Sequence, residues 1–185
     1  TSSLSRDDQL VDLAKDNKID FFRGNEKDVL GRYYKSALAF NGDIIVRICA
    51  DNPFIDPIEI DRLIKFFKNN KCDYAFNHQS RMESKYADGF GAEIFTFDLL
   101  KKINSIAIKS KHREHVTLFL WEENHNFIMK AVPAPESLSY PEHKYDIDLP
   151  EDKNNIIRII NNGININSSA VEIVEISNKI KNNPS

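Results

Sequence analysis

Two aspartates, Asp51 and Asp148, occupy the same local pattern at distant places in the sequence. Asp51 ends an apolar, β-branched run and is soon followed by Pro57, while Asp148 ends an alternating segment and is soon followed by Pro150. Carboxylates at the carboxyl ends of strands lie at the edge of an open α/β sheet where ligands bind. Hard oxygen ligands suit Mg²⁺, which usually binds together with phosphates. The two aspartates therefore form a candidate magnesium pair, and helix capping is the alternative role for each of them.

Two further segments offer groups that could bind a substrate. Arg113, Glu114 and His115 lie near the start of a predicted helix, where backbone amides favour anions. A solvated first turn with an internal charge pair is the alternative there. Gly89 permits a close backbone approach to a ligand, and Glu93 offers hydrogen bonds to sugar hydroxyls.

Weaker candidates complete the set. Arg23 precedes a turn glycine and a helix, so it could lie beside a phosphate, although a turn explains the same residues. Asn52 directly follows the first aspartate and is a candidate for substrate binding. The sequence contains neither a GxGxxG fingerprint nor a P-loop.

The elements that must position these residues are predicted from hydrophobic periodicity. A buried central strand is expected at 44–50, and other strands at 19–22, 72–76, 92–97, 127–132 and 145–148. Helices are expected at 10–16, 26–40, 57–71, 97–103, 109–123, 150–160 and 169–180. Strands that alternate with helices predict an α/β fold with a mainly parallel sheet flanked by helices, in one domain over 1–185.

Composition excludes several classes of protein. A net charge of −3 gives no electrostatic footprint for nucleic acid. The sequence contains no apolar run near the ~20 residues that a membrane helix needs. The two cysteines are isolated, so a reducing, cytoplasmic compartment is expected.

Five ordered segments, at 23–30, 47–56, 88–93, 113–117 and 146–152, resemble the cytidylyltransferase family of spore coat polysaccharide biosynthesis protein F. That family is related to the CMP-sialic acid and CMP-KDO synthetases. The resemblance implies a GT-A-like Rossmann nucleotidyltransferase fold and Mg²⁺-dependent transfer of a nucleotidyl group, CMP from CTP, to a sugar or sugar acid with release of pyrophosphate. It also implies a homodimer. As site residues it implies the metal ligands Asp51 and Asp148, with Arg23, Asn52, Gly89, Glu93, Arg113, Glu114 and His115 at the substrates.

One departure from the family concerns the triphosphate. Family members begin with a strand and a basic, Ser/Gly-containing loop, and nothing like it precedes the first helix here. The expectation is therefore an N-terminally truncated nucleotidyltransferase domain, a fragment lacking the first strand and the triphosphate loop, which binds CTP poorly and does not turn over. Two alternatives are a non-catalytic domain that binds sugar nucleotides or proteins, and a GT-A glycosyltransferase. The latter normally carries Asp-x-Asp, whereas Asn52 and Pro53 follow Asp51 here.

Overall fold

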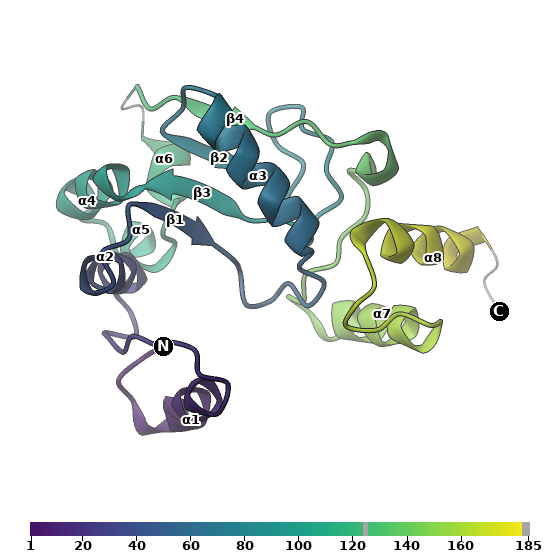
Figure 1. Ribbon diagram of the computed structural model, residues 1–185, viewed down its shortest axis with the longest axis horizontal. Coiled ribbons are helices and arrows are strands. Elements are labelled where there is room, and N and C mark those ends of the chain that lie inside the picture. Colours follow the sequence, from purple (N-terminus) through teal and green to yellow (C-terminus); the bar gives the residue numbers. More distant parts are fainter. Residues whose placement is uncertain (124–125, 183–185) are drawn as a thin grey trace. The chain divides into compact units, whose positions relative to one another are not determined.

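The computed structural model describes residues 1–123 and 126–182 (Figure 1). The chain divides into two compact units, each built from two segments. The first unit comprises Thr1–Ile45 and Phe95–Phe127, and the second comprises Val46–Ile94 and Ile128–Ser185. The boundaries between the units fall inside two strands, β1 (Ile44–Arg47) and β3 (Glu93–Thr96). A single domain stays a prediction.

The sheet has four strands in the order β1-β3-β2-β4, where β2 is Tyr74–Phe76 and β4 is Met129–Ala131. Strands β2 and β4 run parallel with Ala75 opposite Lys130. The predicted α/β fold, with a sheet flanked by helices, is confirmed, and the sheet as a whole is mixed. The predicted central strand at 44–50 corresponds to β1. This strand is shorter than predicted, and it lies at one end of the strand order. An apolar run predicts a strand but does not specify its neighbours.

The first unit is mainly helical. It contains η1 (Ser5–Asp7), α1 (Asp8–Asp16), α2 (Val29–Ala39), α4 (Phe97–Ile106), α5 (Ser110–Glu114) and α6 (Leu118–Glu122). Helix α2 packs against α4 and α5. The ring of Tyr34 stacks on that of Phe97 with centroids 5.6 Å apart, and Leu30 is fully buried. Burial of side chains of this size contributes about 1.5–3 kcal/mol each to folding.

Two predicted elements of the first unit are wrong. The strand expected at 19–22 does not form, and this stretch takes part in no ladder. The single helix expected over 109–123 is two short helices. It breaks because His115 adopts an extended backbone, with φ −100° and ψ 96°.

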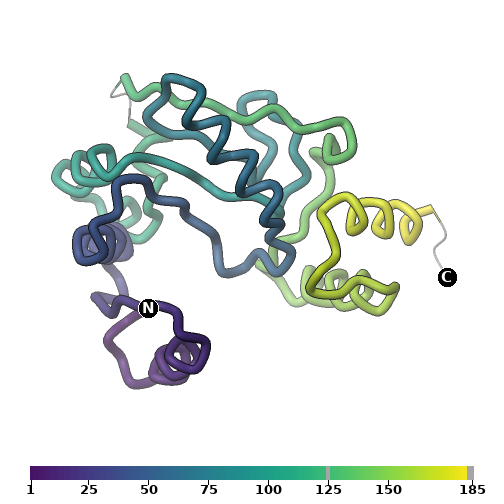
Figure 2. The backbone as a smooth tube through the Cα atoms, viewed as in Figure 1, coloured from purple at the N-terminus to yellow at the C-terminus, as the bar shows by residue number. Residues whose placement is uncertain are grey.

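The second unit places helices around β2 and β4. It contains α3 (Pro57–Asn69), η2 (Glu136–Leu138), α7 (Pro150–Asn161) and α8 (Ala170–Asn182). Helix α3 packs on β2, where Leu63 and Phe67 enter the hydrophobic core. Figure 2 shows the path of the chain from α7 into α8, and these helices pack against each other.

Asp56 fixes the start of two helices in the second unit. Its carboxylate accepts a hydrogen bond from Ile58 N at 2.8 Å, so it caps α3. The other carboxylate oxygen accepts a hydrogen bond from Ala170 N at 2.7 Å, at the start of α8. A buried carboxylate at two helix N-termini is stabilised by both sets of amides.

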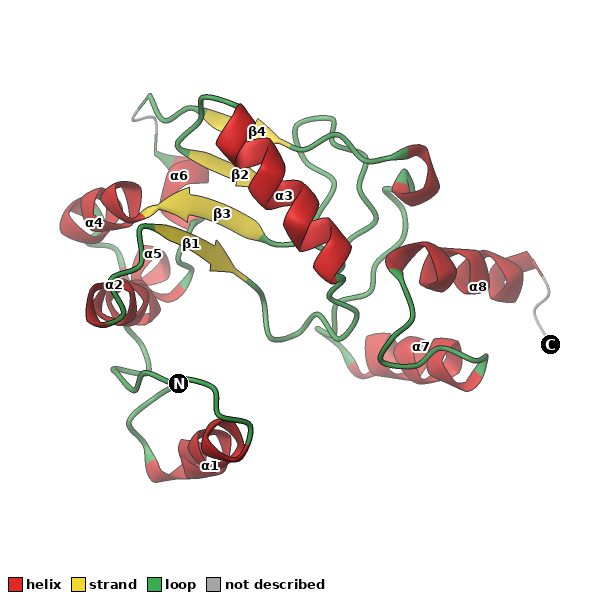
Figure 3. Cartoon of the chain, viewed as in Figure 1, coloured by secondary structure: helices red, strands yellow, loops and turns green. Residues whose placement is uncertain are grey.

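The connections that carry the candidate site are loops (Figure 3). The segment 77–92 joins β2 to β3 without regular structure. The strand predicted at 145–148 does not form, and the only β contact there is an isolated bridge between Asp88 and Lys144, counted over the described ranges. No helix among residues 1–123 and 126–182 is long and apolar enough to cross a membrane.

Candidate active site

Asp51 and Asp148 both belong to the second unit, on segments that meet. The backbone N–H of Ile147 donates to the carbonyl oxygen of Asp51 at 2.9 Å. This bond joins the loop after β1 to the residue that immediately precedes Asp148. The two segments therefore meet, and Asp148 stands in an irregular segment instead of at the end of a strand. That the two carboxylates share one ion stays a prediction.

Gly89 brings a third acidic residue to the same place. Its φ of +111° lies in the left-handed region, and a Cβ built on it would lie 2.9 Å from Tyr145 Cβ. Only glycine allows this close approach. The sequence predicted a close approach to a ligand, whereas the structure shows one to a neighbouring backbone segment. Asp88 consequently lies beside the 143–145 segment: its N–H donates to His143 O at 2.9 Å, and its carbonyl accepts from Tyr145 N at 3.1 Å.

We call Asp51, Asp88, Asp146 and Asp148 the acidic cluster. Burial, and next the charge of Asp146, raise the pKa of the Asp88 carboxyl to about 7, and the charges of Asp51 and Asp148 act in the same direction. Burial also raises the pKa of Asp146. Burial is thus the main cause of both shifts, and the neighbouring carboxylates of the cluster add to the shift of Asp88.

Lys144 partly neutralises the cluster. Its ammonium lies 2.8 Å from an Asp148 oxygen and 3.5 Å from oxygens of both Asp146 and Asp152. The hydrogen bond to Asp148 raises the pKa of Lys144 above its usual range. Asp152 also caps α7, because its carboxylate accepts from Leu149 N at 2.8 Å.

These residues fit a divalent cation. Asp146 Oδ1 is buried and has no hydrogen-bond partner in the part of the chain that the structure describes. A cation at the cluster would offset both the burial and the neighbouring negative charge that raise the pKa of Asp88. Within the described ranges, no three His, Cys, Asp or Glu side chains are arranged to hold a metal ion by themselves. This arrangement suits Mg²⁺, which commonly takes one or two carboxylates and completes its shell with phosphate and water.

Glu93 and Asn52 are the other candidates in the second unit. The Glu93 side chain is only 2% exposed, with one oxygen paired to Arg47 and the other accepting from the Tyr74 hydroxyl at 2.6 Å. Its carboxylate is therefore not presented to solvent, whereas the predicted contact with sugar hydroxyls requires an accessible carboxylate. Asn52 is also buried, at 8% exposure, directly beside Asp51.

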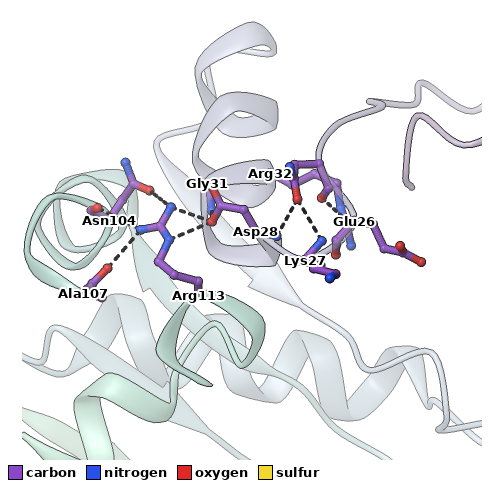
Figure 4. Close-up of polar contacts among 9 residues, drawn as sticks. Glu26, Lys27, Asp28, Gly31, Arg32, Asn104, Ala107 and Arg113 are labelled. Carbon is purple, nitrogen blue, oxygen red and sulfur yellow. Dashed lines mark hydrogen bonds and ion pairs between the residues drawn. The ribbon is translucent and has the colours of Figure 1, made fainter. Parts of the chain in front are cut away.

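Arg113 is held inside the first unit (Figure 4). Its Nε and Nη2 lie 2.7 and 2.6 Å from Asp28 Oδ1, and the same Asp28 oxygen accepts from Gly31 N at 3.0 Å as the cap of α2. Its Nη1 donates to the carbonyl oxygen of Asn104 at 2.9 Å, and its Nη2 to the Asn104 side chain at 2.8 Å. Arg113 therefore forms an ion pair with Asp28, the N-cap residue of α2, instead of the internal charge pair of a solvated first turn that was the alternative.

The remaining first-unit candidates differ in their surroundings. The guanidinium of Arg23 donates to the carbonyls of Ser2 and Leu4 and pairs with Asp8 at 2.8 Å, so it holds the N-terminal segment in place. Glu114 and His115 are exposed. Their predicted contacts with substrate stay predictions.

Sequence reasoning missed Asp88, Asp146 and Lys144. Asp88 directly precedes the glycine that was singled out, and Lys144 lies four residues before Asp148. The position of Asp88 next to Gly89 and the spacing of Lys144 from Asp148 can both be seen in the sequence. The bridge that joins the two segments, however, is a tertiary contact that no local pattern reveals.

Comparison with known proteins agrees with this architecture. The cytidylyltransferase family model matches residues 2–180. The chain is 30% identical to a cytidylyltransferase of known structure from Leptospira borgpetersenii serovar Hardjo-bovis, which it matches with a TM-score of 0.85 over 100% of this chain and 75% of that one.

Two curated proteins are similar in sequence. An uncharacterized protein of Methanocaldococcus jannaschii is 33% identical over 152 residues, 82% of this chain and 60% of that protein. The spore coat polysaccharide biosynthesis protein SpsF of Bacillus subtilis is 29% identical over 181 residues, 97% of this chain and 73% of that protein. The chain thus spans less than two thirds of the first relative and about three quarters of the second. On the extent of the family match, the chain belongs to the cytidylyltransferase family.

Proposed function

We propose that this protein transfers a cytidylyl group from CTP to a sugar or sugar acid, with release of pyrophosphate, in the synthesis of a polysaccharide or another glycan. Family membership supports the reaction type, and the similarity to the spore coat polysaccharide protein supports the biosynthetic setting. The observation that carries the proposal is the 2.9 Å hydrogen bond from Ile147 N to Asp51 O, which joins the segments of the two candidate metal ligands.

Asp51 and Asp148 would hold Mg²⁺ in this proposal. When bound, the ion supplies positive charge to the phosphates of the nucleotide as charge develops during transfer. The protein contributes positioning: the Asp51–Ile147 bond holds the two segments together, and the cap at Asp56 anchors the loop that follows Asp51. Such positioning can account for a large share of the rate in a reaction between two bound substrates.

The test is a pyrophosphate-release assay on the full-length protein with Mg²⁺, with CTP, ATP or UTP as donor and a panel of sugars and sugar acids as acceptors. We expect release with CTP, and a loss of at least about 100-fold in Asp51→Asn, since the change removes a metal-binding charge. Asp61→Asn is the matched control, because Asp61 is an exposed aspartate of α3 in the same unit. We expect this control to keep the wild-type rate.

Two outcomes contradict the proposal in different ways. An Asp51→Asn variant with the wild-type rate removes Asp51 from the mechanism. Binding of CTP or a sugar nucleotide without any pyrophosphate release by the wild type supports the non-catalytic binding domain instead.

A further inference from the structure

The ammonium of Lys144 contacts two carboxylates of the acidic cluster. It lies 2.8 Å from Asp148 Oδ2 and 3.5 Å from Asp146 Oδ2, and both carboxylates belong to the candidate metal site. Among residues 1–123 and 126–182, Lys144 is the basic residue that forms ion pairs with Asp146 and Asp148. Its charge therefore stabilises these carboxylates in the protein without metal.

A divalent ion on Asp148 Oδ2 would compete with this ammonium. Mg²⁺ binds carboxylate oxygens at about 2.0–2.1 Å, while the ammonium already donates to the same Asp148 oxygen. Two positive charges a few Å apart repel strongly near a protein surface. Binding of a divalent cation to this oxygen therefore favours release of the Lys144 ammonium from Asp148.

The side chain of Lys144 is free to make this movement. It is 45% exposed, and it borders a cavity of about 340 Å³ formed by the 142–145 segment, α7 and α8. Its four-carbon stem can carry the ammonium several Å without movement of the backbone. The backbone itself is held by the bridge to Asp88.

We propose that Lys144 is a phosphate-binding residue that also substitutes for the metal. Without metal its ammonium neutralises Asp146 and Asp148, and with metal and nucleotide bound it contacts the phosphates of CTP. The contact is favourable because phosphate brings negative charge to the group that has just lost its carboxylate partner. This inference rests on the proposed function and adds a residue to the binding site.

The test compares Lys144→Gln with wild type, both as full-length protein, in two calorimetric titrations, one with Mn²⁺ alone and one with CTP plus Mg²⁺ and no acceptor sugar. Removing the ammonium should tighten Mn²⁺ binding about tenfold, because the ion no longer competes with it. The same change should weaken CTP binding about tenfold, because one charged contact is lost. Lys153→Gln, on an exposed lysine of α7, removes the same charge and should change neither affinity.

Opposite signs in the two titrations support the inference, because a merely structural role for Lys144 would weaken both. Unchanged Mn²⁺ affinity or unchanged CTP affinity in Lys144→Gln overturns the inference while leaving the proposed function in place. Absence of Mn²⁺ binding and of CTP binding in the wild type overturns both. Lys144→Arg keeps the positive charge and should retain wild-type Mn²⁺ affinity, and a gain in that variant contradicts the charge argument.

Discussion

The contact between Arg113 and Asp28 gives the sharpest prediction about the first unit. The Arg113 side chain is 22% exposed and the Asp28 side chain 37%. Hydrogen bonds to charged groups contribute about 1.5–3 kcal/mol each when buried, but exposed ion pairs contribute only about 0–1 kcal/mol. For this half-buried set we expect Arg113→Met to lower the free energy of unfolding by about 2–3 kcal/mol, since it also leaves the Asn104 carbonyl without its donor.

The assay is urea unfolding followed by the fluorescence of Trp121, the only tryptophan in the sequence and part of α6 in the same unit. Arg6→Met is the matched control, because Arg6 pairs with Glu26 at the surface and its side chain is 65% exposed. We expect the control to cost less than about 1 kcal/mol. A double-mutant cycle of Arg113→Met with Asp28→Asn should give a coupling free energy of at least about 1 kcal/mol.

Gly31→Ala tests the same contact from another side. In an open helix position this change stabilises by up to about 1 kcal/mol. Here a Cβ would lie 2.2 Å from Asp28 Oδ2 and 2.8 Å from Arg113 Nη2, so we expect destabilisation instead. An Arg113→Met variant as stable as the control, or a stabilised Gly31→Ala variant, would refute the structural role of Arg113.

The remaining predictions concern the second unit. Because the folded-state pKa of Asp88 is about 7, above its usual 3.8, its favourable contribution is present below pH 4 and is lost as the pH rises through 7. With chelator present, we therefore expect the free energy of unfolding of Asp88→Asn to increase relative to wild type as the pH is raised from 5 to 9. The expected increase is about 1–2 kcal/mol after allowance for partial exposure. A stability difference that does not vary with pH contradicts this. Asp56→Ala should cost about 2–3 kcal/mol in thermal or urea unfolding, because it uncaps α3 and α8 together, whereas a loss below about 1 kcal/mol would show that neither cap matters.

Local sequence patterns predicted most of the helices. The Asp56-Pro57 start of α3 and the Pro150 start of α7 follow from capping and proline chemistry, which act within a single turn. The break between α5 and α6 was missed because the apolar residues Val116 and Phe119 fit one continuous helix equally well. Periodicity carries no information on where the backbone leaves the helical region.

The site was predicted only as far as the sequence could describe it. Asp51 and Asp148 were singled out by their neighbours, and their segments do meet. The role of Gly89 was misjudged, because the partner of its close approach is Tyr145, more than fifty residues away. Strand order, and the tertiary bridge that brings Lys144 and Asp88 together, depend on long-range packing that a single sequence does not reveal.

The central claim is that Asp51 and Asp148 together hold the divalent ion of a nucleotidyl transfer reaction. The most direct measurement is a crystal structure of the protein with Mn²⁺ and CTP, with the ion located by its anomalous scattering. We predict one Mn²⁺ with carboxylate oxygens of both Asp51 and Asp148 within about 2.0–2.4 Å and phosphate oxygens completing its shell. An ion bound to the nucleotide with neither carboxylate in its shell would contradict the account.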